Sequence, residues 1–257
     1  GIEQVKFLSE LGKIEADGLV AQEVVPKLEK IKEIILNGSG FKYSLTSSRE
    51  SIKTGESEIN KFNSNLSSFK AHKITPYDTK LKEEFSNYAN TDFKNYVQIP
   101  AQVSFASMAY PGVSYLNKDG ASLQILSQLL TFKHLHSEIR EKGGAYGGGA
   151  TYDGLNGIFN YYSYRDPTPF QSVNVFKDAP NVVVEKIKSG EISLEDLDQS
   201  KLTIFQKVDA PISVDQEGMS MFNYGIDDEV RQERREALLE VELEDVIECA
   251  EKYVTEN

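Results

Sequence analysis

The sequence predicts an α+β fold in which helices pack on one face of a mostly antiparallel sheet. Three observations support this prediction. Most of the chain carries apolar residues at helical spacing, which indicates amphipathic helices. Residues 41–46, 95–108 and 145–166 alternate in polarity instead, which indicates a few strands among these helices. The last of these segments contains Asp-Gly and Asn-Gly, which are typical of a hairpin and therefore of antiparallel neighbours.

The first part of the chain is predicted to be mainly helical. Residues 1–37 carry apolar side chains at helical spacing, and Asn37-Gly38 ends the pattern. Residues 51–70 repeat that spacing and are predicted to form a second helical segment. The polar and irregular stretch 71–95 is expected to be a connecting loop.

Two strands are predicted before the hairpin. In 41–46 the residues expected on one face are Phe41, Tyr43 and Leu45. In 95–108 they are Val97, Ile99, Ala101, Val103 and Phe105. Pro100 lacks an N–H group, so it suits the start of a strand or an edge position.

The second part of the chain is predicted to be a long helix, a hairpin and further helices. The leucine-rich helix covers 121–142 and ends at Gly143-Gly144. The strands of the hairpin lie within 145–166. The hydroxyl of Ser193 can cap the helix that follows it, with Asp196 three residues on. The remaining predicted helices are 167–190, 193–208, 227–241 and 243–254.

Charge and composition exclude several kinds of function. The formal net charge is −12, which makes nucleic acid an unsuitable partner because phosphate backbones demand clustered Lys and Arg. An acidic surface instead attracts basic ligands. No apolar run approaches the length needed to span a bilayer, so membrane insertion is not expected. The single cysteine, Cys249, excludes a disulfide within the sequence.

The glycine-rich segment REKGGAYGGG, residues 140–149, does not match a phosphate-binding loop. Gly149 and Ala150 stand where that loop needs Lys and Ser or Thr. The glycines also follow a helix, whose C-terminal end repels anions, rather than leading into one. A strand with few side chains instead lets an extended peptide approach and pair through its main chain.

Two side chains beside these glycines suit a peptide ligand. Arg140, in the last helical turn, and Tyr146, just after Gly143-Gly144, could both donate to a peptide carbonyl or an oxyanion. A plainer interpretation remains open for each: Arg140 complements the helix C-terminus, and Tyr146 only packs against its neighbours. The candidate substrate-binding residues are Arg140, Gly143, Gly144, Tyr146 and Gly147.

The histidines do not predict a metal site in this sequence. There are three: His72, His134 and His136. His134 and Glu138 share a helical face, but no third zinc ligand is evident and neither zinc-peptidase histidine motif is present. No serine-hydrolase motif is present either. The sequence therefore supplies groups that bind and polarise a peptide, without a metal or a nucleophile to cleave it.

A resemblance to a known family rests on four segments: GIEQVKFL, NYVQIPAQVSFASMAYPGVSY, SEIREKGGAYGGGATYDGLNGIFNYYSYRDP and SKLTIFQKVDAPISVDQEGMSMFNYGIDDEVRQERREALLEV. They resemble the C-terminal domain of the presequence proteases, in the pitrilysin/insulinase superfamily of zinc metallopeptidases. The resemblance covers nearly the whole sequence. It implies an α/β roll fold, with 1–37 as a helical segment of the preceding domain and 38–257 as the C-terminal peptidase-like domain.

The resemblance also implies a function and roles for residues. It implies a zinc endopeptidase of two halves, in which the N-terminal half binds zinc and the C-terminal half binds substrate. Arg140 would hold a substrate carbonyl, and Tyr146 would donate to the tetrahedral oxyanion. Substrates would be basic mitochondrial presequences and other short unstructured peptides such as amyloid-β, cleaved in the mitochondrial matrix. This sequence by itself is expected to be inactive, since zinc belongs to the other half of the polypeptide.

Two alternatives remain open after the resemblance. The same fold serves as a non-catalytic scaffold in the core subunits of the respiratory bc1 complex and in processing peptidases. The sequence could also be a peptide-binding module that acts alone. The Arg140 and Tyr146 pair favours the peptidase. Family members usually continue into a further strand after EKYVTEN, so we expect the sequence to be either truncated there or disordered at its end.

Overall fold

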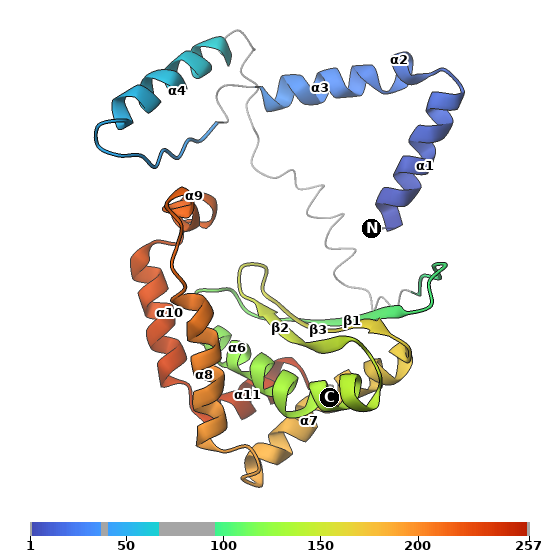
Figure 1. Cartoon of the computed structure of the whole chain (residues 1–257), viewed down its shortest axis with the longest axis vertical. Helices are drawn as coiled ribbons and strands as arrows, with labels where there is room; N and C mark the ends of the chain where they lie inside the picture. The colour runs from blue at the N-terminus through green and yellow to red at the C-terminus, as the bar shows by residue number, and fades with distance from the viewer. Residues whose placement is uncertain (1, 37–40, 67–95, 256–257) are drawn as a thin grey trace. The chain divides into compact units, whose positions relative to one another are not determined.

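The structure, a computed structural model, describes residues 2–36, 41–66 and 96–255. The chain divides into two compact units, Gly1–Asn95 and Tyr96–Asn257 (Figure 1). The assignment of 1–37 to a preceding domain stays a prediction. None of the helices in the described ranges is both long enough and apolar enough to cross a bilayer.

The first unit is helical where it is described. Its helices are α1 (Ile2–Ala16), α2 (Val20–Glu23), α3 (Val25–Ile35) and α4 (Ile52–Leu66). These agree with the helices predicted within 1–37 and 51–70. The predicted loop 71–95 lies outside the described residues.

The strand predicted at 41–46 is wrong. This segment has no regular secondary structure, and no strand among the described residues pairs with it. Its alternating aromatic rings pack locally instead: the Phe41 ring lies 6.2 Å from that of Tyr43 and 6.1 Å from that of Phe62 on α4. Alternation shows which side chains share a face, but a strand also needs a partner for its backbone hydrogen bonds.

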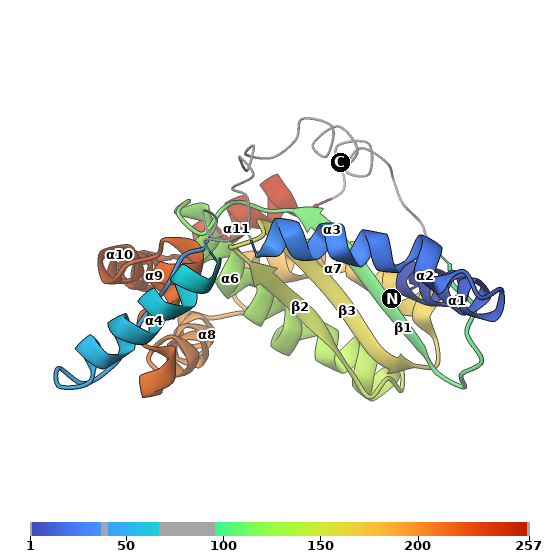
Figure 2. The same cartoon turned by 90° about the horizontal axis from the view of Figure 1, so that it is seen from above.

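The second unit is a small sheet with helices on one face, as predicted (Figures 1 and 2). The three strands lie in the order β1-β3-β2, and both pairings are antiparallel. The long helix α6–η2 packs on β2, and α7 packs on β1 and β3. The elements are β1 (Ser104–Pro111), α6 (Asp119–Leu130), η2 (Thr131–Lys142), β2 (Gly147–Asp153), β3 (Ile158–Asp166), α7 (Pro169–Lys188), α8 (Leu194–Val208), η3 (Val214–Gln216), α9 (Met219–Tyr224), α10 (Asp228–Glu240) and α11 (Leu243–Tyr253).

The core lies between the sheet and these helices. On β3 the side chains of Phe159 and Tyr161 point to the helices and are fully buried. The Tyr161 ring stacks on Phe176 of α7 at 5.6 Å. Leu123 and Leu126 of α6 are also fully buried in this cluster. Burial of these large side chains fixes the long helix against the sheet.

The hairpin and the cap of α8 form as predicted. Asp153 Oδ1 accepts hydrogen bonds from the backbone N–H groups of Leu155, at 3.0 Å, and Asn156, at 3.2 Å, which closes the β2–β3 turn. Ser193 Oγ accepts from the backbone N–H of Asp196, and the Asp196 carboxylate accepts from the backbone N–H of Ser193 at 2.9 Å. This reciprocal pair satisfies two N–H groups at the helix N-terminus.

The strand predicted at 95–108 begins later than expected, and the predicted face is wrong. The strand β1 starts at Ser104, and Ala106, Met108 and Tyr110 face the helices while Phe105 is 55% exposed. The register of β1 and β3 shifts between Ser104 and Phe105, and Arg165 opposite has a φ of 50°. Residues 96–103 form no strand, and Val97 and Ile99 are exposed, so the alternation over 95–108 did not show which face of β1 is buried.

Candidate functional site

The helix that leads to the glycines changes its form along its length. It is an α-helix up to Leu130 and a π-helix from Thr131 to Lys142. At its end the N–H of Gly143 donates to the carbonyl of Glu138, five residues back, at 2.9 Å. Helices of this wide form are rare and occur frequently at functional sites.

Two of the predicted site glycines end this helix. Gly144 has a φ of +77°, in the left-handed region that favours glycine, and its N–H donates to the Arg140 carbonyl at 3.1 Å. A Cβ at Gly143 would lie 2.6 Å from the Ile139 carbonyl oxygen. The backbone of the helix end therefore explains why glycine occupies both positions, and a role of these glycines in binding substrate stays a prediction.

The glycines of β2 differ from one another in what surrounds them. A Cβ at Gly148 would lie 2.7 Å from Ile139 Cγ2, and one at Gly149 would lie 3.0 Å from Thr131 Cγ2. These two let η2 pack closely on the strand. A Cβ at Gly147 would meet no atom within 4 Å. Packing therefore explains Gly148 and Gly149 but not Gly147.

Arg140 and Tyr146 are both on the surface. Arg140 is exposed in the last turn of η2, and its Nη1 lies 3.1 Å from Nε2 of His136. Tyr146 is 69% exposed, and its hydroxyl has no partner among the residues that the structure describes. The interpretation that Tyr146 only packs is therefore weakened, because its phenol is directed to solvent.

The backbone between these two residues is held at several points. The N–H of Ala145 donates to the Ile139 carbonyl at 3.1 Å. The N–H of Tyr146 donates to the carbonyl of Tyr164 on β3, also at 3.1 Å, and their rings lie edge to face at 5.9 Å. The turn that carries Arg140 and Tyr146 is thus fixed to both the helix and the sheet.

The edge of β2 is partly occupied, which sequence analysis missed. Thr131 Oγ1 accepts from the N–H of Ala150 at 2.9 Å and lies 3.2 Å from the Ala150 carbonyl oxygen. A peptide that pairs with β2 cannot use these two groups. Main-chain pairing at this edge would have to use backbone groups of β2 other than those of Ala150. The sequence gives no sign of this contact, because Thr131 and Ala150 belong to different elements and no local pattern connects them.

The histidines within the described ranges do not form a metal site. His134 is half buried, and burial lowers the pKa of its imidazole. Glu138, which shares a helical face with it, accepts a hydrogen bond from Lys142 at 2.6 Å, and this bond lowers the pKa of the Glu138 carboxyl. Among the described residues no group of three or more His, Cys, Asp and Glu side chains could hold a metal ion. His72 lies outside these ranges.

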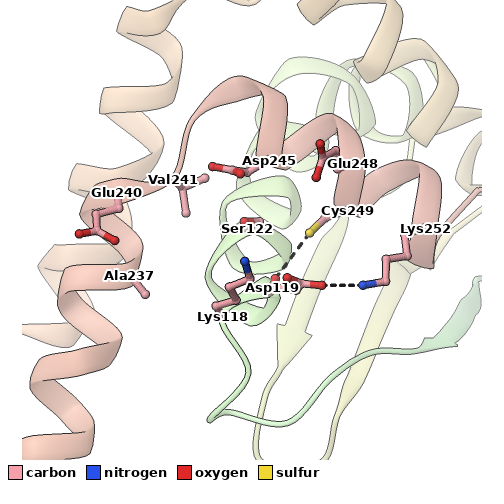
Figure 3. A pocket seen from close by; sticks show the side chains of 10 residues that line it. All are labelled: Lys118, Asp119, Ser122, Ala237, Glu240, Val241, Asp245, Glu248, Cys249 and Lys252. Atoms are coloured by element: carbon pink, nitrogen blue, oxygen red, sulfur yellow. Dashed lines mark hydrogen bonds and ion pairs between the residues drawn. The ribbon is translucent and has the colours of Figure 1, made fainter.

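A separate pocket of about 440 Å³ lies where α6, α10 and α11 meet (Figure 3). At its floor the Asp119 carboxylate accepts from Lys252 Nζ and from the Tyr253 hydroxyl, both at 2.8 Å. Cys249 is buried there, and burial raises the pKa of its thiol to about 11. Such a thiol stays protonated at neutral pH and is a poor nucleophile. The pocket lies at the contact of three helices, and the Cys249 thiol that lines it is not activated as a nucleophile.

Comparisons with known proteins agree with this architecture. A protease from Helicobacter pylori has the same fold, with a TM-score of 0.51 and 16% identity over 77% of this chain and 49% of the other. A conserved protein from Enterococcus faecalis superposes with a TM-score of 0.50 and 16% identity, over 77% of this chain and 47% of the other. These two comparisons show a shared fold.

The sequence comparisons define the family. The sequence model of the family described as PreP C-terminal domain matches residues 94–256, and the chain belongs to this family. It is 44% identical to the protein named presequence protease, mitochondrial, of Candida albicans, over all of this chain and 25% of that protein. The protein of that name in Saccharomyces cerevisiae is 42% identical, over 99% of this chain and 25% of its own length. The chain thus spans about a quarter of the curated relatives it matches, and the predicted family is confirmed.

Proposed function

We propose that this chain is the C-terminal, substrate-binding half of a zinc metalloendopeptidase that degrades mitochondrial presequences and other short unstructured peptides. Family membership supports this proposal, as do relatives at 41–44% identity that are named mitochondrial presequence proteases. The location follows from the same names, and we infer the mitochondrial matrix because freed presequences accumulate there. The other half of the protein would hold the zinc ion.

The chemistry of this half follows from two donors on one turn. The zinc of the other half would polarise the scissile carbonyl and activate water. Arg140 would donate from its guanidinium to a carbonyl of the bound peptide and fix the register. Tyr146 would donate its phenolic O–H to the oxyanion that forms when water attacks. The phenolic donor would lower the barrier because the charge on this oxygen is larger in the transition state than in the bound peptide.

Gly147 and the overall charge support a peptide substrate. The open space over Gly147, directly after Tyr146, lets a substrate main chain approach the backbone of β2. The net charge of −12 favours basic peptides, and presequences are rich in Arg and poor in acids. Amyloid-β-like peptides would be accepted for lack of structure rather than for their charge.

The observation that carries the proposal is an exposed phenolic hydroxyl that bonds to none of the described residues, on a turn whose backbone is fixed, beside an exposed guanidinium. The test is Tyr146→Phe in the full-length protein, with a presequence peptide as substrate. We expect kcat to fall by about 100-fold or more while KM changes little, since Phe removes only the transition-state donor. Isolated residues 1–257 with added zinc should give no turnover.

Three outcomes would count against this proposal. Unchanged kcat in Tyr146→Phe would remove the oxyanion role. Chelator-sensitive turnover by the isolated chain would show that the catalytic metal is bound here. A full-length protein that binds zinc weakly and cleaves no peptide would favour the scaffold function of the same fold.

A further inference from the structure

The guanidinium of Arg140 contacts an imidazole rather than a carboxylate. Its Nη1 lies 3.1 Å from Nε2 of His136, one turn earlier on η2. On the other side of the imidazole, Nδ1 of His136 lies 3.7 Å from Oε1 of Glu141. These three side chains form a row, Glu141–His136–Arg140, along the surface of the helix.

The π-helical form of η2 makes this row possible. In an α-helix, with about 3.6 residues per turn, residues 136 and 140 share a face but 136 and 141 do not. In η2 the backbone bonds connect residues five apart, as in the bond from Gly143 to Glu138. Residues four and five positions after His136 therefore both lie next to it, one at each nitrogen of its ring.

The row orients Arg140 without cancelling its charge. A guanidinium only donates hydrogen bonds, so His136 must present an unprotonated Nε2, with its proton on the Nδ1 that faces Glu141. An imidazole in this form is neutral. The Glu138 carboxylate on the same helix is bonded to Lys142 at 2.6 Å, and no ion pair of Arg140 with a carboxylate is present among the described residues. Arg140 therefore keeps its positive charge and its remaining N–H donors.

We propose that His136 is a positioning residue for Arg140, with the Glu141 carboxylate 3.7 Å from the opposite nitrogen of the imidazole. This inference rests on the proposed function, because it presupposes that Arg140 contacts the bound peptide. An unheld arginine on the surface samples many rotamers, and selecting one of them costs free energy at each turnover. The hydrogen bond to His136 removes part of that cost before substrate arrives.

The test is a double-mutant cycle in the full-length protein with a presequence peptide as substrate. His136→Ala removes the acceptor, and we expect kcat/KM to fall by about 5- to 10-fold, as for loss of one orienting hydrogen bond. His136→Gln keeps an acceptor oxygen and should retain most of the activity. In an Arg140→Ala background, His136→Ala should change kcat/KM by less than about 2-fold. Glu141→Gln should give a smaller loss than His136→Ala.

The outcomes separate this inference from the proposed function. If Arg140→Ala leaves kcat/KM unchanged, both proposals are overturned. If Arg140→Ala is impaired but His136→Ala is not, only the positioning role is overturned. The same holds if the loss caused by His136→Ala persists in the Arg140→Ala background. Melting temperatures of all variants serve as the control, and a general folding defect would appear equally in His136→Gln.

Discussion

At the scale of single residues, the glycines within residues 140–149 have different structural roles. Gly144 supplies a left-handed turn, and Gly148 makes room for Ile139. Among the glycines of residues 140–149, only Gly147 has no atom within 4 Å of the place where a Cβ would be. A sequence shows only that glycines are clustered; whether each one serves the backbone, the packing or a ligand depends on what lies opposite.

This difference predicts opposite results for two neighbouring substitutions. Gly147→Ala should leave the melting temperature nearly unchanged, because its Cβ meets no atom within 4 Å, but should raise KM for peptides. Gly148→Ala is the matched control: its Cβ would lie 2.7 Å from Ile139, and overpacking of this kind costs about 1–3 kcal/mol. Thermal unfolding and steady-state kinetics on both variants test this difference. An unchanged KM in Gly147→Ala would exclude close approach of substrate at this strand.

At the scale of elements, the contact of η2 with β2 decides which part of the strand a ligand can use. The Thr131 hydroxyl bonds to both backbone groups of Ala150 at the strand edge. In many proteins a helix covers the edge of a sheet. Here the Thr131 hydroxyl accepts a hydrogen bond from the Ala150 N–H, which has no neighbouring strand on that side among the described residues.

Replacing Thr131 by Val should loosen this edge. Valine has nearly the same shape but leaves the buried N–H of Ala150 without an acceptor, at a cost of about 1–3 kcal/mol. Hydrogen exchange on the full-length protein should therefore show faster exchange of the Ala150 amide, with little change in α8. Thr131→Ser keeps the hydroxyl and should protect this amide. Equal exchange in all three proteins would mean that the hydroxyl contributes nothing to the edge.

The sequence was sufficient for elements whose signals are local. Capping residues, helical spacing and turn residues predicted α8, the long helix and the β2–β3 hairpin within a few positions. It was insufficient for 41–46, because no strand among the described residues pairs with that segment, and for β1, because the residues before Ser104 form no strand. At the candidate site, helical spacing allows the contact between His136 and Arg140, but it gives no sign that Glu141 also lies beside His136, which the π-helix makes possible.

At the scale of the whole molecule, contacts between helices far apart in the sequence include charged groups. Asp119 on α6 accepts from Lys252 and Tyr253 on α11, more than a hundred residues later. The hydrogen bond from Lys252 and that from Tyr253 lower the pKa of the Asp119 carboxyl. Asp196 has a similarly lowered pKa, because it is bonded to Lys133 and to the cap of α8.

These lowered values predict that the fold is sensitive to acid. A carboxyl whose pKa is lower in the folded state stabilises that state above its unfolded pKa of about 4, and this contribution is lost as the pH falls below it. Asp119→Asn should therefore lower the melting temperature at neutral pH, and its difference from wild type should shrink below about pH 4. Melting curves across this range test the prediction. A constant difference at all pH values would mean that the charge of Asp119 does not matter.

The closed turn from Ile139 to Tyr146 has one more consequence. Four backbone hydrogen bonds, donated by the N–H groups of residues 143–146, fix the backbone that carries both the guanidinium and the phenol, so the backbone positions of Arg140 and Tyr146 are coupled. Closure of the two halves would have to deliver both donors in one movement. A peptide bound one residue out of register would then lose its contacts with both Arg140 and Tyr146. The correct register would be selected by a backbone arrangement that exists before the peptide binds.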